Sequence, residues 1–414
     1  MAKKKSKGRF DFSKIGKIME GISDKTGIMI DNDETASGRE FIDTGIYILN
    51  ALFSKSILSG GIMNNRITAI AGPSGVGKSF IAYNICKNAQ KAGYSVIYID
   101  TEFSIEKADM SAYGLDISPE KLTLIRSNKV EDIKLLLTQM LDQLKTAKLD
   151  GYDIDKTIIV IDSAGQLASN KEVDDALAGK HKADMTRAKA IKSLFRIINS
   201  DLGFLNIPLL VTNHTYLSMD LFPRPIMSGG TGLQYSASSI VFLSKAKLKL
   251  GTEDDMSTGQ SGIIVTAKAD KNRLALPKKV KFEINYTTGC NKYKGLEAFC
   301  TPENYDNVGI AQGKMVVDKE TGEMIFTPGG TRWYVRHLGK SFFAKQIHTK
   351  EVFTQDVLEA LDPIIIKYFE YSDVNEMLEV EKKFIEEQDK HDGSSADDYQ
   401  DIDDIDSADV SLFE

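Results

Sequence analysis

The chain has 414 residues, of which 42% are hydrophobic and 27% are charged. This composition excludes a disordered or fibrous protein and is sufficient for a large buried core divided into two or three domains. The formal net charge of −7 is unevenly distributed: residues 370–414 contain seventeen acidic and three basic side chains, and residues 1–369 have a net charge of +7. A basic body with an acidic tail indicates that the body binds a polyanion, or else that the tail only keeps the protein in solution.

The cysteines and the hydropathy exclude further classes. Cys86, Cys290 and Cys300 are too few and too scattered for a disulfide framework or a zinc site. No apolar run reaches the roughly 18 to 20 residues of a membrane-spanning helix, and no hydrophobic segment follows the basic start as in a signal peptide. We therefore expect reduced thiols and a cytoplasmic protein that does not contact a membrane.

Residues 1–44 are predicted to form a basic arm followed by an oligomerisation segment. Five of the first nine residues are lysine or arginine, which makes this arm too charged to pack. Apolar residues then recur at helical spacing at Phe12, Ile15, Ile18 and Met19. The apolar face of this short helix needs a partner, which is either the body of the same chain or a neighbouring subunit.

From residue 45 to residue 285, strands alternate with helices. The apolar, strand-like runs are residues 66–71, 95–100, 157–162, 207–213, 239–243, 262–268 and 279–284. Between the second and third runs, apolar residues from Ile133 to Leu144 form a helical stripe that is typical of a core. Nearly continuous apolar strands separated by helices predict an α/β fold with a mostly parallel sheet covered on both faces. Ligands of such sheets bind at the carboxyl ends of the strands.

A phosphate-binding pattern, G-x-x-x-x-G-K-[ST], follows the first of these strands and precedes a helix. Its residues are Gly72, Pro73, Ser74, Gly75, Val76, Gly77, Lys78 and Ser79. The glycines let backbone N–H groups surround a β-phosphate, Lys78 can bridge the β- and γ-phosphates, and the Ser79 hydroxyl can bind Mg²⁺. The pattern therefore predicts a site for a nucleoside triphosphate with its Mg²⁺ ion.

Polar residues at three other strand ends complete the predicted site. Asp162 ends an apolar strand and can hold the metal through water beside Ser79. Hydrolysis also needs a group that activates water, and the candidates are Asp100 and Glu102. We favour Glu102, because a carboxylate beyond the strand end can reach an attacking water. His214 could contact the γ-phosphate and report its loss, or it could be a structural histidine.

The remainder of the chain is predicted as a smaller C-terminal domain and a tail. Residues 286–388 include a Gly/Thr-rich stretch at 321–331, the only tryptophan, Trp333, and an amphipathic region at 352–369. Residues 389–414 are strongly acidic and poor in apolar side chains, so we expect this tail to be disordered.

The order and spacing of these motifs resemble those of RecA-family recombinases. The matching segments are residues 72–79, 98–102, 159–163, 213–216 and 229–232. Residues 182–196 are similar to the UvsX-like recombinases of large tailed bacteriophages. The resemblance implies a RecA-like P-loop ATPase core at residues 45–285 that binds ATP and Mg²⁺. It also implies that Glu102 is the catalytic glutamate and that His214 senses the γ-phosphate.

Further positions take expected roles from the same resemblance. Lys271 and Arg273 resemble a basic pair that reaches the triphosphate of a neighbouring subunit; the alternative is a solvated basic turn. The adenine-stacking tyrosine of bacterial RecA-like proteins has no counterpart in residues 105–110. Two loops, residues 168–187 and 216–235, resemble the DNA-binding loops of the family. Their candidate DNA contacts are Lys180, Lys182, Arg187, Arg224, Gly229, Gly230, Thr231 and Gly232.

Three apolar residues of the second loop, Met219, Phe222 and Met227, are expected to be exposed. They would either insert between bases or pack at a subunit contact.

The resemblance implies a DNA-dependent ATPase that forms filaments on single-stranded DNA and catalyses homologous pairing and strand exchange. These reactions serve recombination, repair and recombination-dependent replication. The implied partners are single- and double-stranded DNA, further copies of the chain, and mediator and single-stranded-DNA-binding proteins, in the host cell cytoplasm if the chain is phage-encoded. An acidic tail restrains DNA binding in this family, and the resemblance implies the same role for the tail of this chain. Alternatives are a hexameric helicase with the same core and a non-catalytic DNA-coating protein.

Overall fold

The computed structural model describes residues 40–179, 186–249 and 260–371. The described residues up to Phe369 belong to one compact unit, and Glu370 and Tyr371 lie outside it. The predicted N-terminal helix, the acidic tail and the segment with Lys180 and Lys182 lie outside the described residues. Within the described ranges, no helix has the length and hydropathy needed to cross a membrane.

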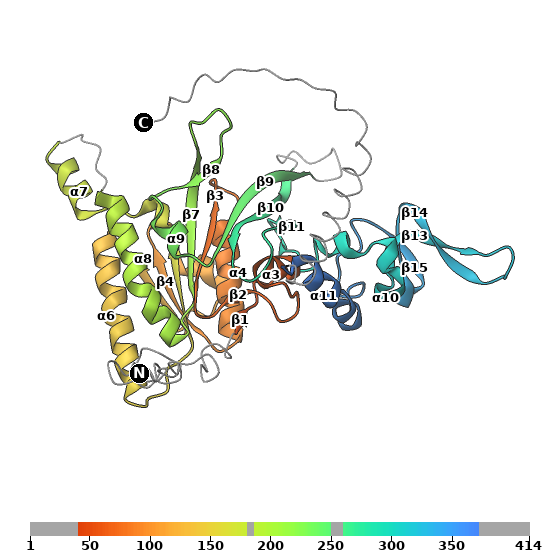
Figure 1. Ribbon diagram of the computed structural model, residues 1–414, viewed down its shortest axis with the longest axis horizontal. Coiled ribbons are helices and arrows are strands. Elements are labelled where there is room, and N and C mark those ends of the chain that lie inside the picture. Colours follow the sequence, from red (N-terminus) through yellow and green to blue (C-terminus); the bar gives the residue numbers. More distant parts are fainter. Residues whose placement is uncertain (1–39, 180–185, 250–259, 372–414) are drawn as a thin grey trace, which may run out of the picture. The chain divides into compact units, whose positions relative to one another are not determined.

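The central sheet has ten strands in the order β12-β11-β10-β9-β3-β7-β6-β4-β5, and β8 pairs with β7 outside this path (Figure 1). Its parallel part consists of β3 (Ile67–Gly72), β4 (Ser95–Asp100), β5 (Leu122–Arg126), β6 (Thr157–Asp162), β7 (Leu209–Leu217) and β9 (Ser239–Lys249). Antiparallel pairing adds β8 (Pro225–Met227), β10 (Gln260–Asn272), β11 (Lys279–Asn285) and β12 (Gly289–Cys290). A separate two-stranded sheet pairs β1 (Phe41–Ile42) with β2 (Ile62–Met63).

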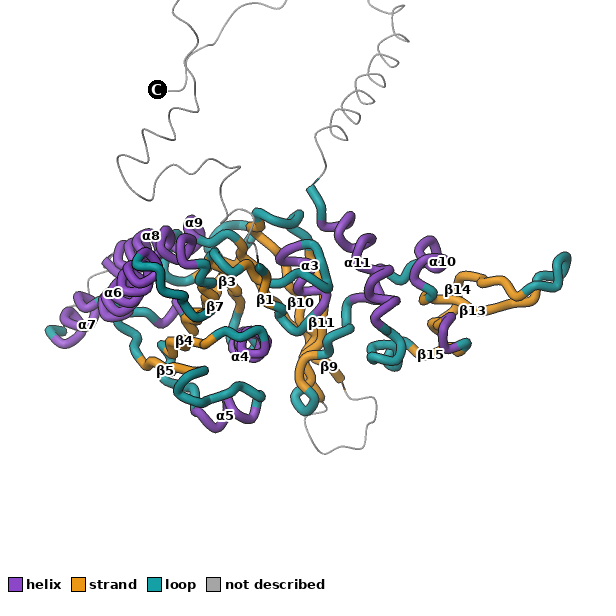
Figure 2. Tube along the Cα trace, turned by 90° about the horizontal axis from the view of Figure 1, so that it is seen from below, coloured by secondary structure: helices purple, strands orange, loops and turns teal. Residues whose placement is uncertain are grey.

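Helices cover both faces of the central sheet (Figure 2). Helix α4 (Lys78–Lys91) shares one core with Ile158 and Val160 of β6, and α6 (Val130–Leu149) and α8 (Thr186–Leu205) share the other core with Ile159 and Ile161. Successive residues of a strand point to opposite faces, so a strand buried on both sides is apolar throughout. The predicted mostly parallel α/β sheet with helices on both faces is confirmed.

Short helices lie in the connections between these elements. They are α3 (Tyr47–Ser54), α5 (Lys107–Ala112), α7 (Asn170–Leu177), α9 (Gly232–Ser236) and the 3-10 turn η2 (Ala164–Gln166). Helix α7 lies within the first predicted DNA-binding loop and α9 ends the second. The described part of both loops is therefore partly helical.

Several strands extend beyond the apolar runs that predicted them. Strand β7 continues to Leu217 because it pairs with β8, and β9 continues to Lys249 because it pairs with β10. These outer segments are polar or exposed, so the apolar runs end before the strands do. In α6 the predicted stripe is buried at Ile133, Leu137 and Leu141, whereas Leu136 is 38% exposed.

The C-terminal region forms a small antiparallel sheet and a helix. Its strands are β13 (Ile310–Val317), β14 (Met324–Val335) and β15 (Lys340–Phe343), and its helices are α10 (Tyr305–Val308) and α11 (Gln355–Phe369). Three short 3-10 turns connect them: η3 (Leu296–Phe299), η4 (Pro302–Asn304) and η5 (Arg336–Leu338). The predicted amphipathic region corresponds to α11, whose Leu361 and Ile365 share a core with Ile48 of α3 and Phe282 of β11. The domain boundary expected near residue 285 stays a prediction.

Candidate functional site

The phosphate-binding loop connects β3 to α4. Gly75 and Gly77 have φ angles of +67° and +91°, in the left-handed region that favours glycine. A Cβ atom at Gly77 would lie 2.6 Å from Cδ1 of Ile284, and one at Gly72 would lie 2.9 Å from the carbonyl oxygen of Leu243. The loop conformation therefore requires glycine at these positions. The N–H groups at the start of α4 face this loop and suit an anion.

Two lysines contact carbonyl groups of this loop. Lys78 Nζ donates to the carbonyl oxygens of Gly72 (3.0 Å) and Pro73 (3.1 Å). Burial lowers the pKa of Lys78, while the carboxylates of Asp162 and Glu102 act to raise it. Lys245 of β9, an exposed residue, donates to the carbonyl oxygens of Gly75 (2.9 Å) and Ser74 (3.3 Å). The sequence did not predict this second lysine, since its run of apolar residues ends at 243.

Asp162 lies buried at the carboxyl end of β6, between two neighbouring strands. Its Oδ2 accepts a hydrogen bond from the Tyr98 hydroxyl of β4 (2.7 Å), and its Oδ1 accepts one from the Thr212 hydroxyl of β7. Burial and the nearby Asp162 carboxylate raise the pKa of Tyr98, which keeps the phenol protonated and able to donate. These two partners were not predicted, because only strand register brings them together.

Glu102 lies just beyond the carboxyl ends of β4 and β6, next to His214 of β7. Its Oε1 accepts a hydrogen bond from Ser163 Oγ (3.0 Å) and lies 2.7 Å from His214 Nε2. Asp100 is fully buried, and its carboxylate accepts from the N–H groups of Glu102 (3.1 Å) and Ile105 (3.0 Å). Asp100 therefore holds the turn that presents Glu102, and this geometry favours Glu102 over Asp100 as the group that activates water.

The residues present fit a Mg²⁺ ion bound together with a triphosphate. Mg²⁺ is usually held by one or two carboxylates, phosphate oxygens and water rather than by a cage of protein ligands. Asp162 and the Ser79 hydroxyl supply such oxygens, and Asp162 lies close enough to Lys78 to act on its pKa. Within the described residues, no group of three or more His, Cys, Asp or Glu side chains could hold a metal ion by itself.

An aromatic cluster lies beside the first turns of α4. The ring of Tyr113 is 5.1 Å from the ring of Phe80 and 5.1 Å from the ring of Tyr83, measured between centroids. Tyr113 lies just beyond the stretch 105–110, in which the sequence has no tyrosine.

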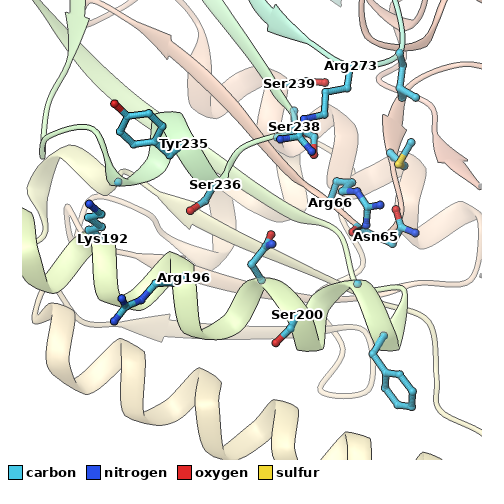
Figure 3. Close-up of a pocket in the computed structure, with 17 residues that line it drawn as sticks. Asn65, Arg66, Lys192, Arg196, Ser200, Tyr235, Ser236, Ser238, Ser239 and Arg273 are labelled. Carbon is cyan, nitrogen blue, oxygen red and sulfur yellow. Dashed lines mark hydrogen bonds between the residues drawn. The ribbon is translucent and has the colours of Figure 1, made fainter. Parts of the chain in front are cut away.

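Lys271 and Arg273 are not brought to the nucleotide site of their own chain. They lie at the end of β10, which pairs with the amino end of β9, whereas the P-loop follows the carboxyl end of the parallel strand β3. Lys271 Nζ donates to the carbonyl oxygens of Gln234 (2.9 Å) and Tyr235 (3.2 Å) at the end of α9. Arg273 lines a cavity of about 880 Å³ next to α8 (Figure 3).

The structure describes six of the eight predicted DNA contacts. Arg224 is exposed near the tip of the β7–β8 hairpin, and the partly buried Arg187 donates to the carbonyl oxygen of Gly165. The segment with Gly229, Gly230, Thr231 and Gly232 passes close to α8, so these glycines also have a packing role.

The apolar residues of the second loop differ in exposure. Phe222 is 77% exposed and Met219 is fully exposed, as expected. The expectation that Met227 is exposed is wrong, because pairing of β8 with β7 directs this side chain into the core beneath α8, where it is 5% exposed.

Comparison with known proteins shows the family of the chain. Residues 12–291 match the RecA N-terminal domain family. The chain belongs to the RecA family. It is 30% identical to the "Recombination and repair protein" of Enterobacteria phage T4, over 69% of this chain and 70% of that protein. It is 26% identical to "Protein RecA" of Picosynechococcus, over 58% and 65% of the two chains.

Another relative is similar over less of its own length. The chain is 27% identical to the "Mitochondrial DNA repair protein recA homolog" of Dictyostelium discoideum, over 56% of this chain and 48% of that protein. The predicted resemblance and the RecA-type α/β fold are confirmed by these matches, and the relatives' names support a recombinase function in recombination and repair.

Proposed function

We propose that this RecA-family chain is a DNA-dependent ATPase that polymerises on single-stranded DNA and catalyses homologous pairing and strand exchange. The observation that carries the proposal is the position of Glu102, whose carboxylate is held by Ser163 and His214 at the strand ends that also bear the P-loop and Asp162. A glutamate in this position can activate a water molecule for attack on a γ-phosphate.

Each residue of the site would have its own role in hydrolysis. Ser79 and Asp162 would hold Mg²⁺, which neutralises charge on the phosphates when it is bound. Lys78 donates to the carbonyl oxygens of Gly72 and Pro73 in this structure and would donate to phosphate oxygens instead when the triphosphate is bound. Among the described residues, both hydrogen-bond partners of the Glu102 side chain contact Oε1, so Oε2 would accept the proton from water. The products are ADP and phosphate.

His214 connects this chemistry to the DNA-binding region. It lies on β7, which continues directly into the β7–β8 hairpin that carries Met219, Phe222 and Arg224. The carbonyl oxygen of His214 also accepts from the N–H of Ser228 (3.0 Å), on the other side of this hairpin. Loss of the γ-phosphate would therefore be reported to the hairpin through His214.

Contact between subunits completes the proposal. Lys271 and Arg273 lie away from the P-loop of their own chain, so we assign them to the triphosphate of a neighbouring copy. ATP would join adjacent subunits in a filament, and hydrolysis would loosen it. The partners that we propose are single- and double-stranded DNA, further copies of the chain, and mediator and single-stranded-DNA-binding proteins, acting in a cytoplasm.

The test measures ATP hydrolysis stimulated by single-stranded DNA, together with three-strand exchange. We expect Glu102→Gln to lower turnover by a factor of about 10² to 10⁴ while nucleotide binding persists, because only the general base is lost. Asp155→Asn, on an exposed loop outside the site, is the matched control and keeps turnover. Turnover of Glu102→Gln at the wild-type rate would refute the assignment of the base. Closed rings in electron micrographs, or failure of strand exchange, would refute the recombinase.

A further inference from the structure

The cavity that contains Arg273 is strongly basic. It lies between α8, α9 and the amino ends of β3 and β9, and four cationic side chains line it: Arg66, Lys192, Arg196 and Arg273 (Figure 3). None of the seventeen described residues that line it is a carboxylate. All four cations are exposed. A concave surface with one sign of charge concentrates the electrostatic field and selects an anionic partner.

An acidic surface flanks the nucleotide site at the other end of β3. Residues 102–109, which we call the acidic rim, carry the exposed carboxylates Glu102, Glu106 and Asp109 and a single cation, Lys107. Phe103 within the rim is 56% exposed and has a φ angle of +57°, in the left-handed region. The rim therefore presents negative charge and an aromatic ring to solvent.

The rim of a protomer cannot enter the cavity of the same protomer. Met110 of α5, directly after the rim, packs in the core that contains α4, whereas the cavity is walled by α8 on the opposite face of the sheet (Figure 2). The two surfaces also lie at opposite ends of β3, because Arg66 precedes this strand and the P-loop follows it. The cavity and the acidic rim can therefore pair with each other only between two copies of the chain. Such a contact is head-to-tail, and it generates a helical polymer unless it closes into a ring.

We propose that the basic cavity receives the acidic rim of the next protomer, with Arg66, Lys192 and Arg196 extending the contact that Arg273 begins. The inference rests on the proposed function, in which Arg273 reaches the triphosphate of the neighbouring protomer. In that neighbour, Glu102 contacts His214 and Ser163 at the nucleotide site, so the acidic rim that begins at Glu102 would lie close to Arg273. A second copy is favoured over DNA as the occupant, because the cavity also has an apolar lining, Met63, Phe204 and Leu274, that suits the Phe103 ring.

Two charge-reversed variants test this contact. One carries Lys192→Glu and Arg196→Glu in the cavity, and the other carries Glu106→Lys and Asp109→Lys in the rim. Self-association is measured by sedimentation velocity with a non-hydrolysable ATP analogue, with and without an oligonucleotide. Each variant alone places like charges at every junction, and we expect it to need at least about tenfold more protein to assemble than the wild type.

An equimolar mixture of the two variants gives the decisive measurement. In an alternating polymer, the reversed cavity meets the reversed rim and the native cavity meets the native rim, so every junction again pairs opposite charges. We expect the mixture to assemble at the wild-type concentration. Charge-matched controls, Lys314→Glu with Lys319→Glu and Asp153→Lys with Asp155→Lys, reverse exposed charges elsewhere and assemble as the wild type does.

Binding of a fluorescent ATP analogue and thermal unfolding verify that each variant is folded. A mixture that stays unassembled, while wild-type protein assembles and exchanges strands, would overturn this inference and leave the proposed function intact. Normal assembly of the cavity variant with weakened DNA binding would also overturn it, because DNA would then be the occupant. Wild-type protein that does not assemble with nucleotide and DNA would overturn both the inference and the proposed function.

Discussion

Two lysines from different elements contact one P-loop, and only one of them belongs to a recognisable pattern. Lys78, Ser79 and Asp162 could be predicted, because spacing and strand ends mark them in the sequence. Lys245 could not, since its contact with Ser74 and Gly75 depends on the pairing of β9 with β3. Its hydrogen bonds to these carbonyls connect the loop to β9, so we expect Lys245 to position the loop rather than the nucleotide.

Replacement of Lys245 by alanine tests this positioning role. We expect the Kd for an ATP analogue to rise roughly three- to tenfold. This effect is smaller than the loss of a buried charged hydrogen bond would cause, because solvent screens the exposed ammonium group. The turnover number at saturating ATP should stay unchanged, and Lys245→Arg should restore affinity. Lys247→Ala, two residues along the same exposed strand, is the control. Equal Kd values for the two alanine variants would contradict a specific role for Lys245.

At the scale of elements, the seam between α8 and α9 explains a glycine that the sequence assigned to DNA. The predicted reason for glycine at position 232 was close approach to phosphate. The structure adds a second reason, since a Cβ atom there would lie 2.6 Å from Cα of Lys192 in α8. Sequence spacing could not reveal this contact, because it joins residues of two helices. The lengths of β7 and β9 were missed similarly, since pairing rather than hydrophobicity extends them.

Gly232→Ala is therefore expected to separate α8 from α9. We expect a loss of about 1 to 3 kcal/mol in the free energy of unfolding, because the backbone of α8 must move. Gly203→Ala is the matched control within α8: its new Cβ atom would have only an ordinary 3.6 Å contact with Arg66. This control should be neutral or more stable by up to about 1 kcal/mol, because alanine favours a helix. Equal losses of unfolding free energy for Gly232→Ala and Gly203→Ala, measured by urea denaturation, would show that the contact between α8 and α9 does not require glycine at position 232.

At the scale of the whole molecule, the α/β class and the family follow from motifs, whereas the attachment of the C-terminal region does not. Asp362 of α11 accepts hydrogen bonds from Ser56 Oγ (2.9 Å) and the Ile57 N–H (2.7 Å), after α3. Glu297 lies between Lys294 (2.9 Å) and His348 (3.0 Å). Apart from the i,i+3 pair of Lys294 and Glu297, no local pattern marks these contacts, because up to 306 residues separate the partners. The basic cavity was missed for the same reason, since separate segments build it.

The ion cluster at Glu297 is expected to make the free energy of unfolding depend on pH. Burial would raise the pKa of Glu297, but hydrogen bonds from His348 and Lys294 outweigh it and lower the pKa to about 2. An unfolded glutamate titrates near pH 4.3, so the stabilisation is complete above that pH and is lost as the pH falls towards 2. We expect a loss on the order of 2 kcal/mol between pH 5 and pH 2.

Denaturant unfolding as a function of pH measures this dependence. Glu297→Gln should be less stable at pH 7 and should lose less stability on acidification than the wild type. The control, Glu320→Gln on an exposed turn, should follow the wild-type profile. Parallel profiles for the wild type and Glu297→Gln would show that the cluster does not cause the acid sensitivity.

The charge asymmetry of the chain gives a prediction about DNA binding that needs no structure of the tail. Residues 370–414 have a net charge of −14 and residues 1–369 a net charge of +7, so we expect the tail to compete with DNA for the basic body. Removal of residues 370–414 should tighten binding of single-stranded DNA most at low salt. The Debye length, over which charges interact, is about 30 Å at 0.01 M salt and only about 8 Å at 0.15 M. The difference in affinity between the two chains should therefore shrink as salt is added.

A second tail variant separates charge from bulk. A tail of the same length with its acidic residues replaced by Asn and Gln should bind DNA as tightly as the truncated chain, because only the charge competes. Fluorescence anisotropy with a labelled oligonucleotide, titrated at several salt concentrations, gives the affinities. Equal affinity of the full-length and truncated chains at low salt would mean that the tail does not reach the DNA-binding surface. Weak binding by the neutral tail would instead assign the restraint to its volume.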